Sequence, residues 1–150
     1  MPTTAHEPTV ILPADEAPPC LWMRLRLAAK RLMTLYEARL APSGVSMAQF
    51  GLLAGITEEP ELTISRLAEK RELAPSTLTH SLRPMQDAGW IEVFTDADNR
   101  RIKRLRLTKE GRARFKAAYA GWKQAQAEAA AIVPPKAVEQ VLRATEKLPL

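Results

Sequence analysis

Hydrophobic positions recur at helical spacing over most of the chain from Cys20 onward. Apolar residues three and four positions apart, as between Leu21 and Leu40, are typical of one face of an α-helix. Polar, glycine and proline residues interrupt the pattern and separate one helix from the next. The pattern predicts six helices, over residues 20–40, 47–58, 64–70, 75–88, 108–132 and 135–148.

Several of the predicted helix ends carry recognisable signals. Ser46 and Thr63 directly precede two helices and are expected to cap them by accepting a backbone N–H. Pro75 suits the first turn of the fourth helix, where its missing N–H leaves no bond unmade, and Gly89 suits the end of that helix. The apolar positions predict a core formed by Phe50, Leu53, Ile56, Ile64, Leu67, Ala68, Leu78, Leu82 and Met85.

A β-hairpin is predicted between the fourth and fifth helices. Residues 90–95 and 102–107 replace the helical spacing with alternation that is typical of strands. The cluster Asp-Ala-Asp-Asn, from Asp96 to Asn99, has the composition of a turn. The expected fold class is therefore mainly α (α+β), with six helices and one β-hairpin whose tip is polar and basic.

Charge is distributed unevenly along the chain, whose net charge is +5. The first 20 residues contain three acidic and no basic side chains, so the remaining 130 residues carry a balance of +8. Between Arg100 and Lys116 there are nine basic residues and a single acidic one, Glu110. A solvated surface is the simplest explanation of a charge run. The density of this one, and its position at the hairpin tip, favour a polyanionic partner.

The remaining composition argues against several classes of protein. Residues 1–19 contain five of the 12 prolines and no sustained periodicity, which predicts a flexible N-terminal arm. No apolar run is long enough to span a bilayer and no secretory signal is visible, so we expect a cytoplasmic protein without a membrane partner. One cysteine and two histidines give no basis for a disulfide framework, a metal site or a catalytic triad. We therefore expect no cofactor and no enzymatic activity.

Two short helices, a tight turn and a hairpin, in this order, are typical of a winged helix-turn-helix. Residues 64–70 would brace the helix 75–88, which is narrow enough to enter the major groove of double-stranded DNA. The predicted DNA-contacting side chains of that helix are Ser76, Thr77, Thr79, His80 and Arg83. Those of the wing are Arg100, Arg101 and Lys103. An arginine in the wing can enter a narrow minor groove, whose negative potential attracts it.

Four segments of the chain resemble the MarR family of transcriptional regulators. They are VSMAQF from Val45, TISRLAEKREL from Thr63, APSTLTHSLRPMQDAGW from Ala74 and DADNRRIKRLRLTKEG from Asp96. The most specific part is the wing pattern D-x-x-D/N-R-R followed by L-T-x-x-G. The resemblance implies one domain over residues 20–150, with a winged helix-turn-helix lobe at 46–107 and dimerisation helices at 20–40 and 108–150.

The resemblance also implies a function. It points to a homodimer that binds a pseudo-palindromic DNA site, and we expect a repressor that a small phenolic or aromatic ligand, or an oxidant, releases from DNA. The family's polar recognition positions fall on Ser76, Thr77, Thr79 and His80, and its wing arginines on Arg100 and Arg101. His80 replaces an arginine that many members have. Asn99 replaces the usual wing aspartate, and an amide can hydrogen-bond an arginine but cannot form an ion pair with it.

Three residues near the first helix allow two interpretations each. Cys20 is a candidate redox sensor, because a helix N-terminus and the nearby Arg24 favour the reactive thiolate. The alternative, which the general behaviour of free cysteines favours, is a small buried residue of a dimer interface. Trp22 and Tyr36 are candidates for a ligand pocket, or else they pack in the core or between subunits.

The predicted recognition helix also leaves alternatives open. The hydroxyls of Ser76, Thr77 and Thr79 suit a helix cap as well as a DNA contact. Pro84 within the helix predicts either a kink or a local irregularity without a role in recognition. At the level of function, the main alternative to a sequence-specific regulator is a non-specific architectural DNA-binding protein, and the ratio of specific to non-specific affinity distinguishes the two.

Overall fold

The computed structural model describes residues 20–148 of the chain. Its elements are α1 (Leu21–Leu40), the 3₁₀ turn η1 (Ala41–Ser43), α2 (Met47–Glu58), α3 (Ile64–Lys70), α4 (Pro75–Asp87), β1 (Ile91–Thr95), β2 (Lys103–Leu107), α5 (Lys109–Ile132) and α6 (Pro135–Thr145). The prediction of six helices and one hairpin, in a mainly helical fold, is therefore confirmed. The flexible arm predicted for residues 1–19 lies outside the described residues.

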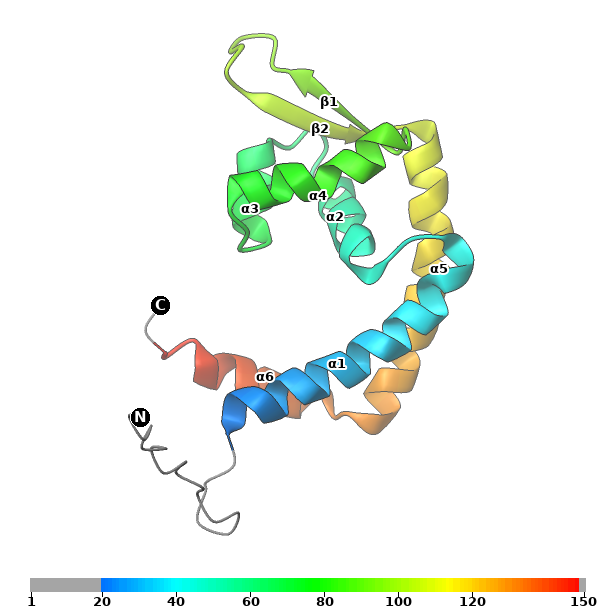
Figure 1. Ribbon diagram of the computed structural model, residues 1–150, viewed down its shortest axis with the longest axis vertical. Coiled ribbons are helices and arrows are strands. Elements are labelled where there is room, and N and C mark those ends of the chain that lie inside the picture. The colour runs from blue at the N-terminus through cyan, green and yellow to red at the C-terminus, as the bar shows by residue number, and fades with distance from the viewer. Residues whose placement is uncertain (1–19, 149–150) are drawn as a thin grey trace, which may run out of the picture.

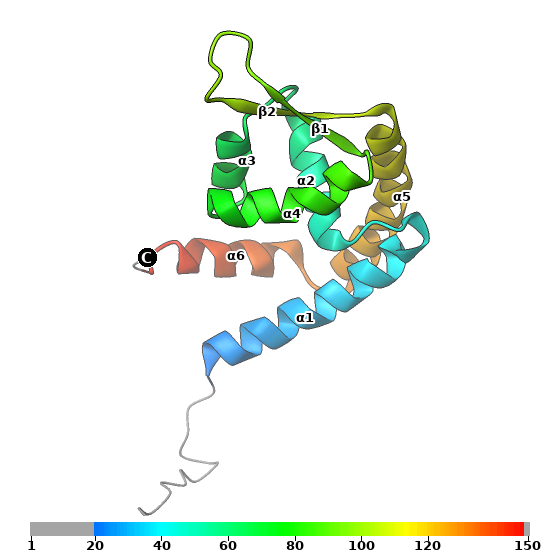
Figure 2. The same ribbon diagram turned by 45° about the horizontal axis from the view of Figure 1, so that its top comes forward.

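The elements form a compact lobe and a projecting stem (Figure 1). The lobe contains α2, α3, α4 and the β1–β2 hairpin, and α5 begins at the base of the hairpin. The stem consists of α1, the C-terminal half of α5, and α6, and it extends from the end of the lobe opposite the hairpin (Figures 1 and 2). Within the stem, α1 packs along α5. Two segments of the chain join the stem to the lobe, namely α5 and the short link between α1 and α2.

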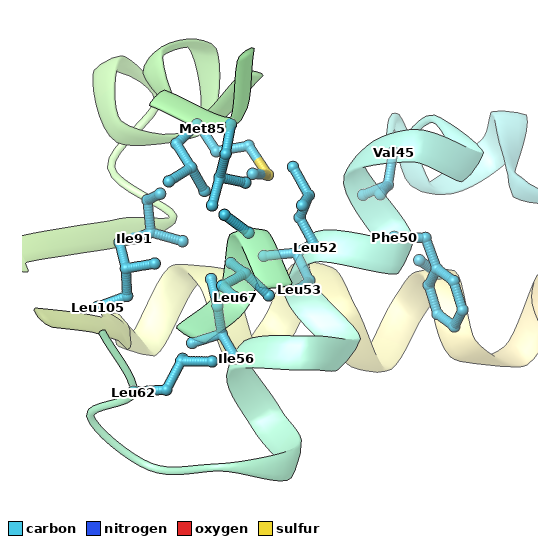
Figure 3. Close-up of a cluster of buried hydrophobic side chains, with 14 of the residues drawn as sticks. Val45, Phe50, Leu52, Leu53, Ile56, Leu62, Leu67, Met85, Ile91 and Leu105 are labelled. Atoms are coloured by element: carbon cyan, nitrogen blue, oxygen red, sulfur yellow. The ribbon is translucent and has the colours of Figure 1, made fainter. Parts of the chain in front are cut away.

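One hydrophobic core holds the lobe together (Figure 3). Leu53, Leu67 and Leu105 come from α2, α3 and β2 and have no exposed surface. The nine predicted core positions are buried except Ile64, which is half-buried against the core. Full burial of one such side chain contributes roughly 1.5–3 kcal/mol. The stem lacks an equivalent core: beyond Leu105, the buried hydrophobic residues of the described chain are Ala118, Ala125 and Ala129, and α6 has none.

The predicted caps of α2 and α3 are present. Ser46 Oγ accepts a hydrogen bond from the N–H of Gln49 at 3.1 Å, and Gln49 Oε1 accepts one from the N–H of Ser46 at 3.0 Å. This reciprocal capping box satisfies two backbone donors at once. Thr63 Oγ1 caps α3 in the simpler way, through one N–H at 3.0 Å.

The geometry at the start of α5 explains the L-T-x-x-G pattern. Thr108 Oγ1 accepts the N–H of Gly111 at 3.0 Å, and the same hydroxyl donates to the carbonyl of Gly89 at 2.6 Å. Gly111 lies against the backbone of Trp90, where an added Cβ would be 1.8 Å from the carbonyl oxygen. The threonine therefore caps the helix and ties it to the end of α4, and only glycine permits the close approach.

The strand boundaries differ slightly from those predicted. At the end of α4, Gly89 adopts a left-handed conformation with φ 71°, and the N–H of Trp90 donates to the carbonyl of Met85 at 2.9 Å. This closes the helix in a Schellman-type arrangement, so that β1 begins at Ile91 and not at Trp90. Likewise Ile102 belongs to the turn, because its N–H donates to the carbonyl of Asn99 at 2.9 Å.

The hairpin is antiparallel, with Val93 opposite Leu105. A third segment extends it: the N–H of Leu105 donates to the carbonyl of Leu62 at 2.9 Å, and Thr63 forms an isolated bridge with Arg104. Leu62 and Thr63, just before α3, therefore attach the wing to the loop between α2 and α3.

Among the described residues, no single helix has the length and apolar content to cross a membrane. The α1–η1 segment and α2, taken together, are long and apolar enough for a membrane span, but they meet at a bend of 73°. The apolar residues of α2 supply much of the buried core of the lobe.

Candidate nucleic-acid interface

The helix α4 has one face in the core and one face in solvent. Leu78, Leu82 and Met85 are buried. The predicted contact residues on the other face are all exposed, and they are Ser76, Thr77, Thr79, His80 and Arg83. α4 therefore presents a polar surface with two basic side chains, while its apolar side fixes it against α2 and α3.

The hydroxyl groups of α4 do not cap it. The residue at the cap position is Ala74, which has no side chain able to accept a hydrogen bond. Thr79 Oγ1 instead donates its hydrogen to the carbonyl of Pro75 at 2.9 Å, and the same oxygen can still accept a hydrogen bond from a ligand. The capping alternative is therefore not supported for Ser76 and Thr77, which lie inside the helix and are exposed.

Pro84 does not end α4. The helix continues to Asp87, and the N–H of Ala88 donates to the carbonyl of Pro84 at 3.0 Å. The proline cannot donate a backbone N–H to the carbonyl of His80, four residues earlier. α4 nevertheless retains its length through Pro84.

The tip of the wing is organised by Asp96. Its Oδ1 accepts backbone N–H groups from Asp98 at 3.0 Å and Asn99 at 2.9 Å, and its Oδ2 is paired with Nε of Arg104. Arg104 Nη1 also donates to the carbonyl of Glu61 at 2.9 Å. The wing is thus fixed at both ends, by Asp96 within the turn and by Arg104 to the loop before α3.

These contacts lower the pKa of Asp96 below its ordinary value. The hydrogen bond from Arg104 is the largest cause, followed by the backbone N–H groups of Asp98 and Asn99, and burial opposes them. The carboxylate therefore stays ionised, as the ion pair requires. At Asn99, where the sequence comparison leads us to expect an aspartate, Oδ1 accepts the N–H of Arg101 at 3.0 Å, and the ion pair within the wing is formed by Asp96.

Seven of the nine basic residues predicted as one cluster form two groups, and the other two, Lys109 and Lys116, are exposed on α5. Arg100 and Arg101 are exposed at the wing tip, and neither forms an ion pair within the described chain. Lys103 is exposed beside them and donates to Thr95 Oγ1 at 2.7 Å. The other group is bound by the protein itself: Arg104 to Asp96, Arg106 to Glu92, Arg112 to the Leu107 carbonyl and Arg114 to Glu110.

Four of the arginines between Arg100 and Lys116 therefore stabilise the wing and the start of α5. Apart from these four, the exposed cations of this run that form no ion pair within the described chain are Arg100, Arg101 and Lys103 at the tip and Lys109 and Lys116 on α5. Sequence reasoning missed Asp96 and Arg104 as organisers of the wing. The available signal was an aspartate opening the turn cluster and an arginine on the facing strand, but their pairing depends on the hairpin register.

The candidate residues of α1 are not brought together. Cys20 is exposed at the residue before α1, and its roles as a redox sensor and as a packing residue of a dimer interface both stay predictions. Trp22 is 68% exposed, with the guanidinium of Arg26 over its ring. Tyr36 hydrogen-bonds Gln126 of α5. Fourteen residues of helix separate Trp22 from Tyr36 by roughly 21 Å, so they do not line one pocket in a single chain.

Tyr36 does line a surface hollow of about 350 Å³ between α1, α5 and α6. Its other walls include Leu32, Ala129, Val138 and Leu142. The hollow is mainly apolar, and the hydroxyl of Tyr36 and the amide of Gln126 supply polar groups at one side.

Known proteins share the sequence pattern and the fold described above. Residues 45–103 match the model of the MarR family. The structure of the transcriptional regulator MosR of Mycobacterium tuberculosis in complex with DNA is 33% identical, covers 85% of this chain and 94% of its own, and superposes with a TM-score of 0.76. The transcriptional repressor MdtR of Bacillus subtilis is 25% identical over 135 residues, which are 90% of this chain and 87% of the relative. A mutant MarR from E. coli complexed with operator DNA shares the fold, at 21% identity, coverage of 86% and 94%, and a TM-score of 0.75.

Proposed function

This chain belongs to the MarR family, which comprises transcription regulators and not enzymes, and on that premise we propose that it is a transcriptional repressor that binds a pseudo-palindromic operator as a homodimer. The observation that carries the proposal is that two elements suited to binding DNA belong to one lobe. The exposed face of α4 and the hairpin that carries the wing arginines are attached to a common hydrophobic core. The relatives MosR and MarR were solved with DNA, and MdtR is named a repressor, which supports this assignment.

We assign different tasks to the two elements. Arg100, Arg101 and Lys103 would bind phosphates or the minor groove and supply affinity that depends little on sequence. His80 and Arg83, with the hydroxyls of α4, would read base edges in the major groove. Because Arg104 is held by Asp96, we exclude it from the set of DNA-contacting residues and assign it to wing geometry.

The stem supports the homodimer. Exposed large hydrophobic side chains are concentrated on it, and they are Leu21, Trp22, Met23, Leu25, Leu27, Met33, Ile132, Val138, Val141 and Leu142. The other described members of this class are Leu73 in the lobe, Tyr119 in the N-terminal half of α5 and Leu148 just after α6. A patch of this extent on a monomer is unusual, and a second copy that buries it in a symmetric interface accounts for it.

The signal that releases the protein from DNA has two candidates. One is a small aromatic or phenolic ligand in the hollow beside Tyr36, which borders the proposed dimer interface. The other is oxidation of Cys20, which is exposed in the single chain. Thermal unfolding with salicylate and, separately, with cumene hydroperoxide distinguishes them: the ligand raises the melting temperature reversibly, whereas the peroxide acts on the wild type and not on Cys20→Ser.

The function is tested by selecting duplexes from a random pool and measuring affinity at fixed salt. We expect an inverted-repeat consensus, bound about a thousandfold more tightly than random DNA, with an affinity that falls linearly on a log–log plot against salt as counterions are released. A tight but equal affinity for the consensus and for random duplexes would instead identify a non-specific architectural protein. Absence of duplex binding at low salt would refute both.

A further inference from the structure

The stem meets the lobe at an elbow, residues 41–46, where the chain turns from α1 into α2. The axis of α1 with its 3₁₀ extension is bent by 73° relative to α2. Gly44 makes the turn possible, since its φ of 71° is left-handed. Two side chains from outside the elbow hold it, and neither takes part in the DNA interface described above.

Glu37 holds the elbow from the side of the stem. It lies in the last turns of α1, and its Oε1 accepts the N–H of Met47 at 2.9 Å. Met47 is the first residue of α2, whose N–H has no partner within its own helix. A carboxylate is favourable at this position because it also faces the positive end of the helix dipole. Glu37 therefore connects α1 directly to the start of the first lobe helix.

Arg114 holds the elbow from the side of α5. Its Nη1 donates to the carbonyl of Ser43 at 3.3 Å, and its guanidinium lies over the ring of Trp90, 5.6 Å from the centroid. An ion pair with Glu110, one turn earlier, fixes the side chain at 2.9 Å. The guanidinium also lies next to the turn itself, since Nη1 would be in ordinary contact, at 3.7 Å, with a Cβ added at Gly44.

We propose that Glu37 and Arg114 form a clasp that sets the angle between stem and lobe, and that they thereby determine which spacing between DNA half-sites the dimer accepts. The inference rests on the proposed function, because the stem must join two lobes for the angle to matter. Arg114 contacts three parts of the fold, α5, the elbow and Trp90. Glu37 secures the same joint from its other side, so that the two side chains leave the lobe little freedom to pivot.

The geometry of DNA makes half-site spacing sensitive to this angle. Two recognition helices must reach major grooves about 34 Å apart, and each inserted base pair moves a half-site by about 3.4 Å and rotates it by about 34°. A rigid joint accommodates such a displacement only by deforming the DNA, which weakens binding. A flexible joint lets the lobe reach the displaced half-site. Its affinity for the optimal site is lower, because binding must then order the joint. Both residues are therefore positioning residues, and neither is expected to touch DNA.

The test uses the full chain and a palindromic duplex selected from random DNA by the wild type, with variants that have one base pair removed from or added to the centre. We expect the wild type to lose about tenfold or more in affinity on either change, the equivalent of about 1.4 kcal/mol. Arg114→Ala and Glu37→Ala should bind the optimal site more weakly and lose less than about threefold on the spacing changes.

Three further variants separate the clasp from effects of charge and of folding. Lys116→Ala removes a cation two residues along α5 that is exposed, and it should keep the wild-type spacing profile. Glu37→Gln keeps an oxygen that can accept the N–H of Met47 and should also keep it. Arg114→Lys retains the charge but not the planar fork, and it should resemble Arg114→Ala. Circular dichroism and sedimentation confirm that each variant is a folded dimer, and Arg114→Lys and Glu37→Ala serve if Arg114→Ala does not fold.

Two results would overturn the inference. One is a folded clasp variant that discriminates spacing as sharply as the wild type. The other is a wild type that binds its selected site equally well at all three spacings. Failure of the proposed function looks different, because the wild type would then bind no duplex or would sediment as a monomer.

Discussion

Gly111→Ala should destabilise the protein, although alanine is the better helix former. Gly111 is the third residue of α5 and is buried against Trp90. A Cβ at this position would lie 1.8 Å from the Trp90 carbonyl oxygen and 2.8 Å from its carbon. To restore a contact of 3.0 Å, the carbonyl must move by about 1.2 Å. The same oxygen accepts the N–H of Thr108 at 3.0 Å, so the movement also stretches the bond that anchors α5.

The magnitude follows from three contributions. Overpacking of a rigid site costs about 1–3 kcal/mol. Weakening of the bond from Thr108 costs about 1 kcal/mol. The higher helix propensity of alanine returns about 1 kcal/mol. The free energy of unfolding should therefore fall by about 1–3 kcal/mol, a sizeable part of the roughly 5–15 kcal/mol that is typical of a folded protein.

Gly51→Ala is the matched control. Gly51 is also helical, but no atom lies within 4 Å of the Cβ that would be added there. The same substitution should stabilise the protein by about 0.5–1 kcal/mol, through helix propensity and a less flexible unfolded chain. Urea unfolding followed by circular dichroism, at one fixed protein concentration, measures both changes. If Gly111→Ala equals or exceeds the wild type in stability, the packing argument for the L-T-x-x-G glycine is wrong.

Three further predictions concern the wing and the stem. Fluorescence anisotropy should show that Arg101→Ala weakens binding to selected and random duplexes by similar factors, whereas His80→Ala changes the order in which duplex sequences rank by affinity. If Arg101→Ala keeps the wild-type affinity, the wing tip is not part of the DNA interface. Arg104 and the turn amides lower the pKa of Asp96, so the ionised carboxylate stabilises the fold above the ordinary aspartate pKa, and this stabilisation is lost only as the pH falls through the lower pKa of the folded state. An NMR titration of the Asp96 carboxyl carbon should give a midpoint below that of an exposed aspartate. An ordinary midpoint would contradict the wing structure. Gly121→Ala should separate α1 from α5, because its Cβ would lie 2.2 Å from the Arg39 carbonyl oxygen, and sedimentation should then show a weaker dimer; wild-type association would refute this.

The features predicted well from the sequence are local ones. Ser46 and Thr63 mark the helix starts because a cap acts within three residues. Pairings between distant segments were not predictable in the same way. The bond from Leu105 to Leu62 and the ion pair between Asp96 and Arg104 depend on strand register, which a list of apolar and polar residues does not contain.

The candidate site was predicted in part for the same reason. The exposed face of α4 follows from helical periodicity, because its buried leucines leave the polar residues facing outward. The pairing of Arg106 with Glu92 depends on the hairpin register and could not be predicted, whereas that of Arg114 with Glu110 follows from the i, i+4 spacing of one helix. Trp22 and Tyr36 were grouped as aromatic residues of one helix, but a helix places them far apart along its axis.

The absence of buried residues in α6, within the described chain, has a consequence for the fate of newly made protein. A helix of 11 residues is marginal in water unless it packs against something. Its backbone amides in a lone subunit should therefore exchange with solvent quickly and be open to proteases, while the lobe stays protected. A subunit that finds no partner would then be shortened from its C-terminal end before its lobe unfolds. The lifetime of the protein in the cell would therefore depend on the concentration of the subunit, because a higher concentration favours the dimer over the protease-sensitive lone subunit.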